Sequence, residues 1–463
     1  SAQPRSSSAT QSAWRWSSDG QTGFEISATE RETPGTTLIL HMRDDAKEYL
    51  TEWTLRGLVT RYADFVSHPI LIEVTRPVET EGDEPSTETV STFEQVNEAK
   101  ALWQRSKADI TEEEYGAFYT HLTHDWEPAL THSHFKVEGA QLFTGLLYVP
   151  KRPPFDLFSP TQSHGIRLYV KRVFIMDDCD ALLPKWLRFA RGVVDSDDLP
   201  LNVSRELLQD SKAASHIQKQ VSKKLLSCIE DLAKDRPEDF IDFWDNYGLV
   251  LKEGLHLAPE FKERLSKLVR FKTSHPEVEW TSLEDYVERM PEGQDAIYYV
   301  LGESEKALSQ SPHLEALKAK GAEVLYMVDA IDEWAVAGIE AFQDKPLVSA
   351  MKADLKLPSG EDEDSAEAED ATEEIEALIK RFKLVLSDEV SEVRVSQRLT
   401  SSPCCLVMPE GAVHAHVERL LQRHTGQQER TKRILEINPE HDIVVSMTAM
   451  HGEDPDAVRV KDW

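Results

Sequence analysis

Two acidic runs divide this chain, because neither can contribute to a hydrophobic core. Residues 359–374 read SGEDEDSAEAEDATEE and residues 77–92 read PVETEGDEPSTETVST. Segments with so few apolar side chains and so much like charge cannot bury enough surface to fold. The 463 residues therefore separate into about three domains, each large enough for a core. The predicted boundaries are 1–76 for a first domain, 77–92 for a linker, 93–352 for a middle domain, 353–372 for a second linker and 373–463 for a last domain.

Apolar patterning predicts an α/β protein in an α+β multidomain arrangement. Strand signals lie in GFEISAT (23–29), TTLILHM (36–42) and ILIEVTR (70–76), with an amphipathic helix between the last two. We expect the middle domain to contain a large α/β unit to about residue 225, a helical connector and a small α/β unit at about 280–350. Strand–helix–strand order in the small unit predicts parallel pairing with a right-handed crossover. Capping-box spacing predicts three helix starts, at Ser91 with Glu94, Thr111 with Glu114, and Thr281 with Glu284.

The run DSDDLPLNVSRELLQD (195–210) predicts the start of a long helix. Pro200 excludes helix at the residue before it, and Asn202 or Ser204 can cap a helix that begins near Val203 or Arg205. Apolar residues continue at helical spacing as far as Leu232, so one face of this helix should be buried.

Arg205 and Gln209 lie four residues apart, so both should project from one side of the first turn. A guanidinium group at a helix N-terminus, beside backbone N–H donors, is suited to phosphate oxygens. The alternative is a structural ion pair, because Asp195, Asp197 and Asp198 lie just upstream.

Charge and cysteine content exclude several kinds of partner. The net charge of −31 repels phosphate backbones and anionic lipids, so we expect neither nucleic acid nor a membrane as partner. No apolar run approaches the roughly 18–20 residues of a membrane helix. The four cysteines include the adjacent pair Cys404 and Cys405, and their sparseness predicts free thiols in the cytoplasm.

One histidine cluster could suggest a metal. His121, His124, His132 and His134 lie close in sequence, with Asp125 adjacent. No cysteine accompanies them, and ordinary helix and loop positions explain them equally. We therefore predict no metal site.

The stretch DLPLNVSRELLQDS, with LYVKRVFIMDD before it and FWDNYGLVLKEG after it, resembles the middle domain of the ninety-kilodalton heat-shock chaperones, bacterial HtpG type. Further matches in the family's order are ALWQRSKADITEEEYGAFY, PKRPPFDLF, SLEDYVERM, EGQDAIYYV, SPHLEALKAKGAEVLYMVDAIDEW, RLTSSPCCLV and KRILEINPEH. The resemblance implies that residues 1–76 are the end of an N-terminal ATP-binding domain, an α/β sandwich. It also implies that 93–352 is the middle domain and 373–463 a mixed α+β C-terminal domain.

The resemblance assigns roles to particular residues. Arg205 would reach the γ-phosphate of ATP, with Gln209 assisting, and Thr36 would lie on the adenine side of the nucleotide pocket. The first follows the logic of an arginine finger, which stabilises charge on the transferred phosphoryl group. ATP with Mg²⁺ would be the cofactor of the intact family protein.

Three aromatic residues match positions used for protein contacts. By resemblance, Trp103 and Trp334 would contact client proteins, and Phe155 would dock on the N-terminal domain. Exposed aromatic side chains bind unfolded segments without demanding a particular sequence. Core packing is the alternative for each tryptophan, because large aromatic residues are usually mostly buried.

The sequence also departs from the family pattern. The glutamate and asparagine of the nucleotide-binding helix, the DxGxG segment and the glycine-rich lid are not in these residues, so we expect this chain alone to be inactive as an ATPase. It ends after DPDAVRVKDW, where the first dimerisation helix of the family should begin. The resemblance therefore does not predict for this chain the homodimer that the intact family forms.

Three functions compete at this point. The leading expectation is an ATP-dependent chaperone that binds unfolded or partly folded clients, with possible co-chaperones. The second is an ATP-independent holdase or scaffold that uses exposed apolar faces. The third is a hydrolase built on the histidine cluster.

Overall fold

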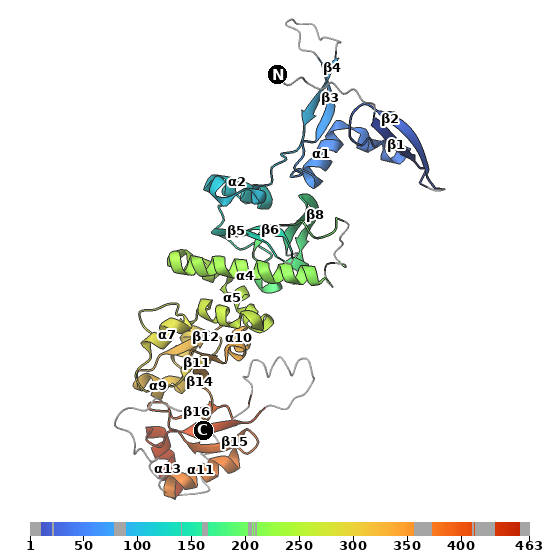
Figure 1. Ribbon diagram of the computed structural model, residues 1–463. Coiled ribbons are helices and arrows are strands. Elements are labelled where there is room, and N and C mark those ends of the chain that lie inside the picture. Colours follow the sequence, from blue (N-terminus) through green and yellow to red (C-terminus); the bar gives the residue numbers. More distant parts are fainter. Residues whose placement is uncertain are drawn as a thin grey trace. The chain divides into compact units, whose positions relative to one another are not determined.

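A computed structural model describes residues 11–20, 23–77, 89–139, 141–159, 165–201, 206, 208, 211–355, 373–409, 412 and 431–453. The chain divides into two compact units, one from Ser1–Arg61 and Ile70–Val96, the other from Tyr62–Pro69 and Asn97–Trp463. Figure 1 follows the chain by colour through both units. Each contains helices and strands, which confirms the predicted α+β multidomain class.

The first unit consists of two antiparallel hairpins and a helix. Strand β1 (Gln11–Ser17) pairs with β2 (Glu25–Arg31), and β3 (Leu71–Pro77) pairs with β4 (Thr89–Gln95). A 3-10 helix, η1 (Asp44–Leu50), leads into α1 (Glu52–Tyr62). The strands predicted from GFEISAT and ILIEVTR and the helix between them are therefore confirmed.

Two predictions for the first unit are wrong. Residues 36–42 form no strand, because no described segment offers them the backbone partners that a strand requires. Ser91 starts no helix. It lies in β4, where its hydroxyl is 3.2 Å from that of Thr75, and Glu94 binds Arg76 at 2.8 Å instead of capping a helix. Residues 89–92 of the predicted linker therefore belong to a strand.

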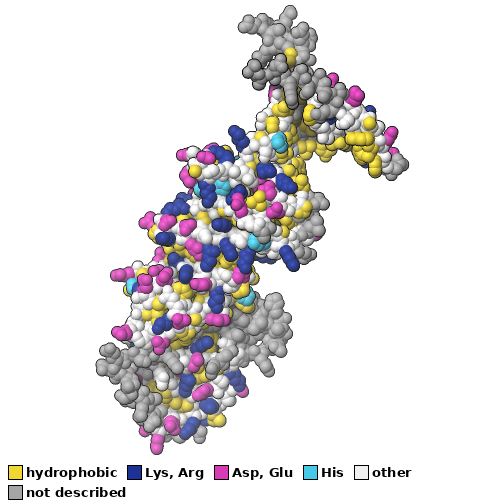
Figure 2. All heavy atoms as spheres, viewed as in Figure 1, with side chains coloured by type: hydrophobic (Ala, Val, Ile, Leu, Met, Phe, Trp, Pro, Cys, Tyr) yellow, Lys and Arg dark blue, Asp and Glu magenta, His cyan; other side chains and the backbone are white. Residues whose placement is uncertain are grey.

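The first unit exposes many large apolar side chains. Those more than half exposed include Trp14, Trp16, Phe24, Ile26, Leu38, Ile39, Leu40, Leu50, Trp53, Leu71 and Phe93. Figure 2 shows hydrophobic side chains gathered over this part of the molecule. Soluble proteins rarely leave so much contiguous apolar surface in water, so this surface is suited to being covered by further polypeptide.

The second unit begins with a five-stranded mixed sheet of order β5-β6-β9-β7-β8. Its strands are β5 (Thr131–Val137), β6 (Phe143–Val149), β7 (Ile166–Val170), β8 (Val173–Cys179) and β9 (Arg191–Ser196). β7 and β9 are parallel, and the other pairs are antiparallel. The carboxyl ends of β7 and β9 therefore lie at the same edge, where Val170 pairs with Ser196.

Helices cover both faces of this first sheet. Helix α2 (Glu112–Thr123) packs with Leu146 and Tyr148 of β6, whereas α4 (Lys212–Asp235) and α5 (Pro237–Leu257) share a core with Leu147 and Val149. This alternation follows from the two-residue period of a strand. Figure 1 shows α2 and α4 on opposite sides of the strands. Short 3-10 turns complete the unit at η2 (Leu102–Gln104), η3 (Lys107–Asp109), η4 (Asp180–Leu182) and η5 (Lys185–Leu187).

Helix starts in this region test two predictions. Thr111 and Glu114 form the predicted capping box, because the Thr111 hydroxyl accepts from the Glu114 N–H and the Glu114 carboxylate accepts from the Thr111 N–H. The single long helix from near Arg205 is wrong. Ser211 has extended backbone angles and caps α4, which begins at Lys212. Its hydroxyl accepts from the Ala214 N–H at 3.4 Å. The apolar period predicts Ser211 in the interior of a helix, but in the structure it is the N-cap of α4.

A second sheet, of order β10-β12-β11-β14-β13, follows α5. Its strands are β10 (Lys272–Thr273), β11 (Ile297–Leu301), β12 (Val324–Met327), β13 (Ala341–Phe342) and β14 (Lys345–Ser349). β11 pairs in parallel with β12, as predicted, and also in parallel with β14. The surrounding helices are η6 (Pro259–Phe261), α6 (Lys262–Leu268), α7 (Leu283–Arg289), α8 (Glu305–Ser309), η7 (Pro312–Leu314), α9 (Glu315–Ala319) and α10 (Asp332–Ile339).

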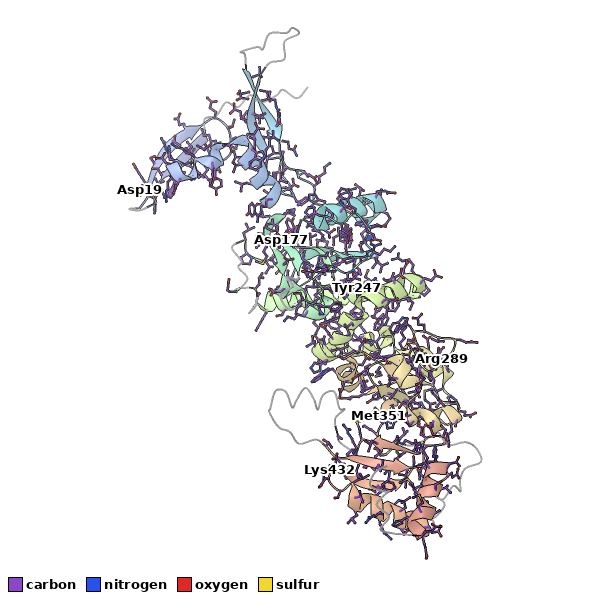
Figure 3. All side chains as sticks on the ribbon, turned by 180° about the vertical axis from the view of Figure 1, so that it is seen from behind. Asp19, Asp177, Tyr247, Arg289, Met351 and Lys432 are labelled. Carbon is purple, nitrogen blue, oxygen red and sulfur yellow. The ribbon has the colours of Figure 1, made fainter. Side chains whose placement is uncertain are left out.

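The helix start predicted at Thr281 is displaced by one residue. Ser282 is the N-cap of α7, and its capping-box partner is Asp285 rather than Glu284. Arg289, at the end of α7 and labelled in Figure 3, donates to the Glu323 carboxylate at 2.8 Å and so ties α7 to the residue before β12.

The last part contains a three-stranded sheet of order β15-β17-β16. Its strands are β15 (Val390–Val395), β16 (Cys404–Val407) and β17 (Arg433–Ile437), and its helices are α11 (Glu373–Val385) and α13 (Asp442–Glu453). The motif RLTSSPCCLV leads into β16, which begins at Cys404.

Candidate functional site

The residues that lead to Arg205 are fixed to the first sheet. After β9, the Ser196 hydroxyl accepts from the backbone N–H groups of Asp198 and Leu199, at 3.3 and 3.2 Å. The Asp197 N–H donates to the Leu142 carbonyl at 3.1 Å, and Leu199 is buried. Five consecutive residues from 195 to 199 are therefore held in place at the carboxyl end of β9.

Arg205 and Gln209 lie outside the described residues. Their near neighbours are placed: Leu208 is buried, and its carbonyl accepts from the Ser211 N–H at 3.0 Å. The roles of Arg205 and Gln209 in phosphate binding remain predictions.

The three aspartates considered as ion-pair partners of Arg205 have other contacts. Asp195 accepts hydrogen bonds from Trp103, Gln104 and the Arg172 N–H. Asp197 lies 3.9 Å from the Arg172 guanidinium, and Asp198 accepts from the Leu142 N–H. These contacts account for the acidic cluster without requiring Arg205.

Trp103 is fully buried, which corrects the expectation that it offers an exposed aromatic surface to clients. Its ring centroid lies 4.8 Å from those of Phe65 and Tyr169, and its indole Nε1 donates to Asp195 at 3.0 Å. A residue with both its ring and its polar atom engaged belongs to the core, as the packing alternative states.

Trp334 and Phe155 do face solvent. Trp334, on α10, is 41 % exposed, and its ring lies tilted against that of His256 of α5, with 5.3 Å between ring centroids. Phe155 is fully exposed, and Phe158 is more than half exposed. Trp334 and Phe155 are both accessible to another polypeptide. Their predicted roles, client contact for Trp334 and docking for Phe155, remain proposals.

The loop that carries Phe155 is anchored on both sides. Tyr247, labelled in Figure 3, donates its hydroxyl to the Pro150 carbonyl at 3.1 Å. Leu157 is buried, and its carbonyl accepts from the Arg188 guanidinium at 2.9 Å. The loop therefore presents Phe155 from a fixed base, as a docking residue requires.

The described residues do not build a cradle for ATP. Thr36 lies in an exposed segment without regular structure, and no second predicted nucleotide contact is placed beside it. Within the described ranges, no group of three His, Cys, Asp or Glu side chains is arranged to hold a metal ion.

Two histidines of the cluster, His132 and His134, pack inside the second unit, whereas His121 and His124 are exposed. His134 on β5 donates from Nε2 to the Trp103 carbonyl at 2.9 Å, and its Nδ1 accepts from the Tyr115 hydroxyl at 2.8 Å. Burial lowers the pKa of His132 and of His134, which keeps both rings neutral. His132 lines a cavity of about 570 Å³ between α2, β5 and α4. Nothing in this arrangement favours the hydrolase alternative.

Asp195 organises this region, although its position in the sequence suggests only an ion pair with Arg205. The structure buries it, and its carboxylate accepts a hydrogen bond from Trp103. The separation of 92 residues between the two left no local pattern that could have linked them.

In the described part of the chain, no helix combines the length and the apolar character that a bilayer crossing requires.

Comparison with known proteins gives consistent matches along the chain. A family model described as Hsp90 protein matches residues 81–463. A protein of Myxococcus xanthus (strain DK1622), named Chaperone protein HtpG, is 55% identical over 456 residues, which cover 98% of this chain and 69% of that protein. Proteins of the same name from Geobacter sulfurreducens and Bordetella avium are 42% and 44% identical, over 97% and 96% of this chain and 70% of each relative. The chain therefore belongs to the Hsp90 family of molecular chaperones, of the bacterial HtpG type.

Proposed function

We propose that this chain supplies the middle and C-terminal parts of an ATP-dependent chaperone, in which Arg205 stabilises the terminal phosphate of ATP and Gln209 assists. ATP with Mg²⁺ would supply the phosphoryl group that is transferred to water. Negative charge develops on that group in the transition state, and a preorganised cation stabilises it.

The observation that carries this proposal is where the described start of the DLPLNVSRELLQDS motif, residues 198–201, leaves the first sheet. The motif follows the carboxyl end of β9, beside the parallel strand β7. In sheets with parallel strands, ligands bind at the carboxyl ends of those strands. The hydrogen bonds at Asp195–Leu199 fix the chain where it leaves β9, which is the preorganisation that electrostatic catalysis needs.

Client binding and location are part of the same proposal. The exposed rings of Trp334 and Phe155 support contacts with unfolded clients or with another domain. The cysteines Cys228, Cys404 and Cys405 are free thiols, which supports the cytoplasm as location. A homodimer is proposed for the longer family protein, and light scattering at several concentrations would measure the assembly of this chain.

The test uses an extended chain, in which the segment that precedes the matched region of the Myxococcus xanthus relative is joined to the start of this sequence. Arg205→Ala should lower ATP turnover by roughly 100-fold, while calorimetry finds nucleotide affinity nearly unchanged. Arg152→Ala is the matched control, because Arg152 is exposed and pairs with Glu127 at 2.8 Å. Turnover equal to that of the control would overturn the proposal.

A second function, the ATP-independent holdase, is favoured by the exposed apolar residues of the first unit. Arg205→Ala distinguishes the holdase from the ATP-driven chaperone. A holdase would suppress client aggregation equally with and without ATP and in Arg205→Ala, whereas an ATP-driven chaperone would lose its nucleotide-dependent part in that variant.

A further inference from the structure

The chain leaves the second sheet through a short segment that pairs with the last sheet. After β14, Lys352 forms a parallel bridge with Met408, the residue that follows β16. The Met408 N–H donates to the Met351 carbonyl, and the Ala353 N–H donates to the Met408 carbonyl, both at 2.9 Å. Met351 is labelled in Figure 3. Because β16 is an edge strand of its sheet, this segment covers part of an edge that could otherwise pair with another chain.

A buried arginine just after β15 binds the same segment. The Arg398 guanidinium donates to the carbonyls of Ala350 and Lys352, at 2.6 and 2.7 Å. Its Nε donates to the carboxylate of Glu436 in β17 at 2.8 Å, and both side chains are almost completely buried. The Arg398 carbonyl also accepts from the Ala316 N–H of α9 at 3.0 Å. The fixed fork of a guanidinium suits it to hold two carbonyls of one segment against a carboxylate of another.

Other polar contacts cross the same boundary in both directions. Glu436 accepts from Arg394 at 2.6 Å, and Arg394 also donates to the Ala353 carbonyl. In the opposite direction, Glu315 of α9 accepts from three consecutive backbone N–H groups, those of residues 400–402. Hydrogen bonds to charged groups are stronger than neutral ones, so these contacts should bind the two regions tightly.

An apolar contact accompanies the hydrogen bonds. The buried residues Leu399, Cys405, Val407 and Ile434 form a small cluster on the last sheet, and Ala353 packs against it. Residues 350–353 therefore make backbone, polar and apolar contacts with this sheet, as a strand of the sheet itself would.

Each of these contacts joins residues 315–353 to residues 394–436, which lie on either side of the acidic run 359–374. We propose that residues 350–353 are an additional edge strand of the last sheet, supplied by the middle part of the chain and held there by Arg398 and Glu436. The middle and last parts then remain bound to each other even when the chain between them is cut. This proposal does not depend on the role of Arg205.

The test cuts the full chain within the acidic run. A recognition site for a sequence-specific protease, flanked by glycine and serine, replaces residues 362–368, and denaturing electrophoresis shows that cleavage is complete. We expect the two pieces to elute together in gel filtration, with the mass that light scattering gives before cleavage. Separation of the two pieces at micromolar concentration would overturn the proposal.

Variants of the cleavable chain test which contacts hold the pieces together. Arg398→Met keeps the aliphatic stem but leaves the Glu436 carboxylate and two carbonyls without the guanidinium. It should weaken association by about 100-fold or more, because breaking a buried ion pair is strongly unfavourable. Glu315→Gln changes a partly exposed side chain, so it keeps the test open if Arg398→Met does not fold. It should weaken association by about 10-fold, because the hydrogen bonds lose their charge assistance.

Arg289→Met is the matched control. Arg289 donates to Glu323 at 2.8 Å, and both residues belong to the middle part. This variant should lower the melting temperature while the cut pieces stay together. Association that is equally strong in Arg398→Met, Glu315→Gln and Arg289→Met would show that other contacts join the pieces and would overturn the role of Arg398 and Glu436.

Discussion

At the scale of single residues, two neighbouring ionisable side chains join η7 and α9 to the last sheet. The Glu315 carboxylate accepts from the backbone N–H groups of Thr400, Ser401 and Ser402, at 2.6, 2.7 and 3.2 Å. His313 is buried in the same region, and its Nδ1 has no hydrogen-bond partner among the described residues. Protonation of either side chain should weaken this junction.

Glu315 predicts a loss of stability in acid. Burial opposes its charge, but the N–H groups and the Ser402 hydroxyl outweigh this and lower its pKa from 4.5 to about 2. A lowered folded-state pKa contributes stability above pH 4.5 that is lost as the pH falls toward 2. The melting temperature of Glu315→Gln should therefore lie below that of the wild type at pH 7, with a difference that shrinks between pH 4.5 and 2. A constant difference would contradict this account.

His313 predicts a loss of folding stability at higher pH than Glu315 does. Burial lowers its pKa from 6.5 to about 4, with a smaller contribution from the positive charge of Arg398, against Glu436. The unfolded chain takes up the proton first, so stability falls as the pH drops from 6.5 to 4. The melting temperature of His313→Leu should therefore change less between pH 6.5 and 4 than that of the wild type. In the wild type, each kcal/mol of stability lost over this range lowers the melting temperature by about 2–4 °C. Parallel melting curves for both proteins would argue against it.

At the scale of elements, a buried lysine connects α5 to α10. Lys252 Nζ lies 2.6 Å from Asp332 and 2.8 Å from Asp329, and both Lys252 and Asp332 are almost completely buried. Burial raises the pKa of Asp332 despite the neighbouring lysine. Both helices lie in the second unit, where α5 packs against the first sheet and α10 lies beside the second sheet, so this ion pair joins the two sheet regions.

Lys252→Met should leave Asp332 buried without its partner. Breaking a buried pair costs about 3–5 kcal/mol, which urea denaturation would measure. Adding Asp332→Asn should restore part of that loss. Lys272→Met is the matched control, because Lys272 pairs with the exposed Glu279 and should cost less than about 1 kcal/mol. Equal losses in the two single variants would contradict the special role of Lys252.

The elements also show what the sequence could and could not predict. The capping box at Thr111 succeeded because an amphipathic helix follows it, whereas the same spacing at Ser91 failed because pairing with β3 outweighs a local motif. Ser211 caps α4 although the apolar period continues through it, so periodicity alone placed the start of this helix too early. Local patterns specify the elements, but their partners are set by residues distant in sequence.

The candidate site shows the same limit. Family motifs identified the Arg205 segment and the exposed Trp334 and Phe155. They could not reveal that Trp103 is buried, because its partners Phe65, Tyr169 and Asp195 come from three separate segments. Contacts of this kind arise only when the chain has folded.

At the scale of the whole molecule, the two units differ in how well they bury apolar residues. The second unit has one large core that runs from the first sheet through α4 and α5 to the second sheet. The first unit leaves most of its large apolar side chains exposed. The matched part of this chain covers 69% of the length of its Myxococcus xanthus relative. The domain boundaries at residues 76, 92, 352 and 372 remain predictions.

The central claim is that Arg205 of this chain stabilises the terminal phosphate of ATP. ATP turnover of the extended chain, compared between wild type and Arg205→Ala at saturating nucleotide, tests it most directly. The account predicts a decrease of roughly 100-fold with nucleotide affinity retained. Wild-type turnover in Arg205→Ala would contradict it and leave only the family and the fold.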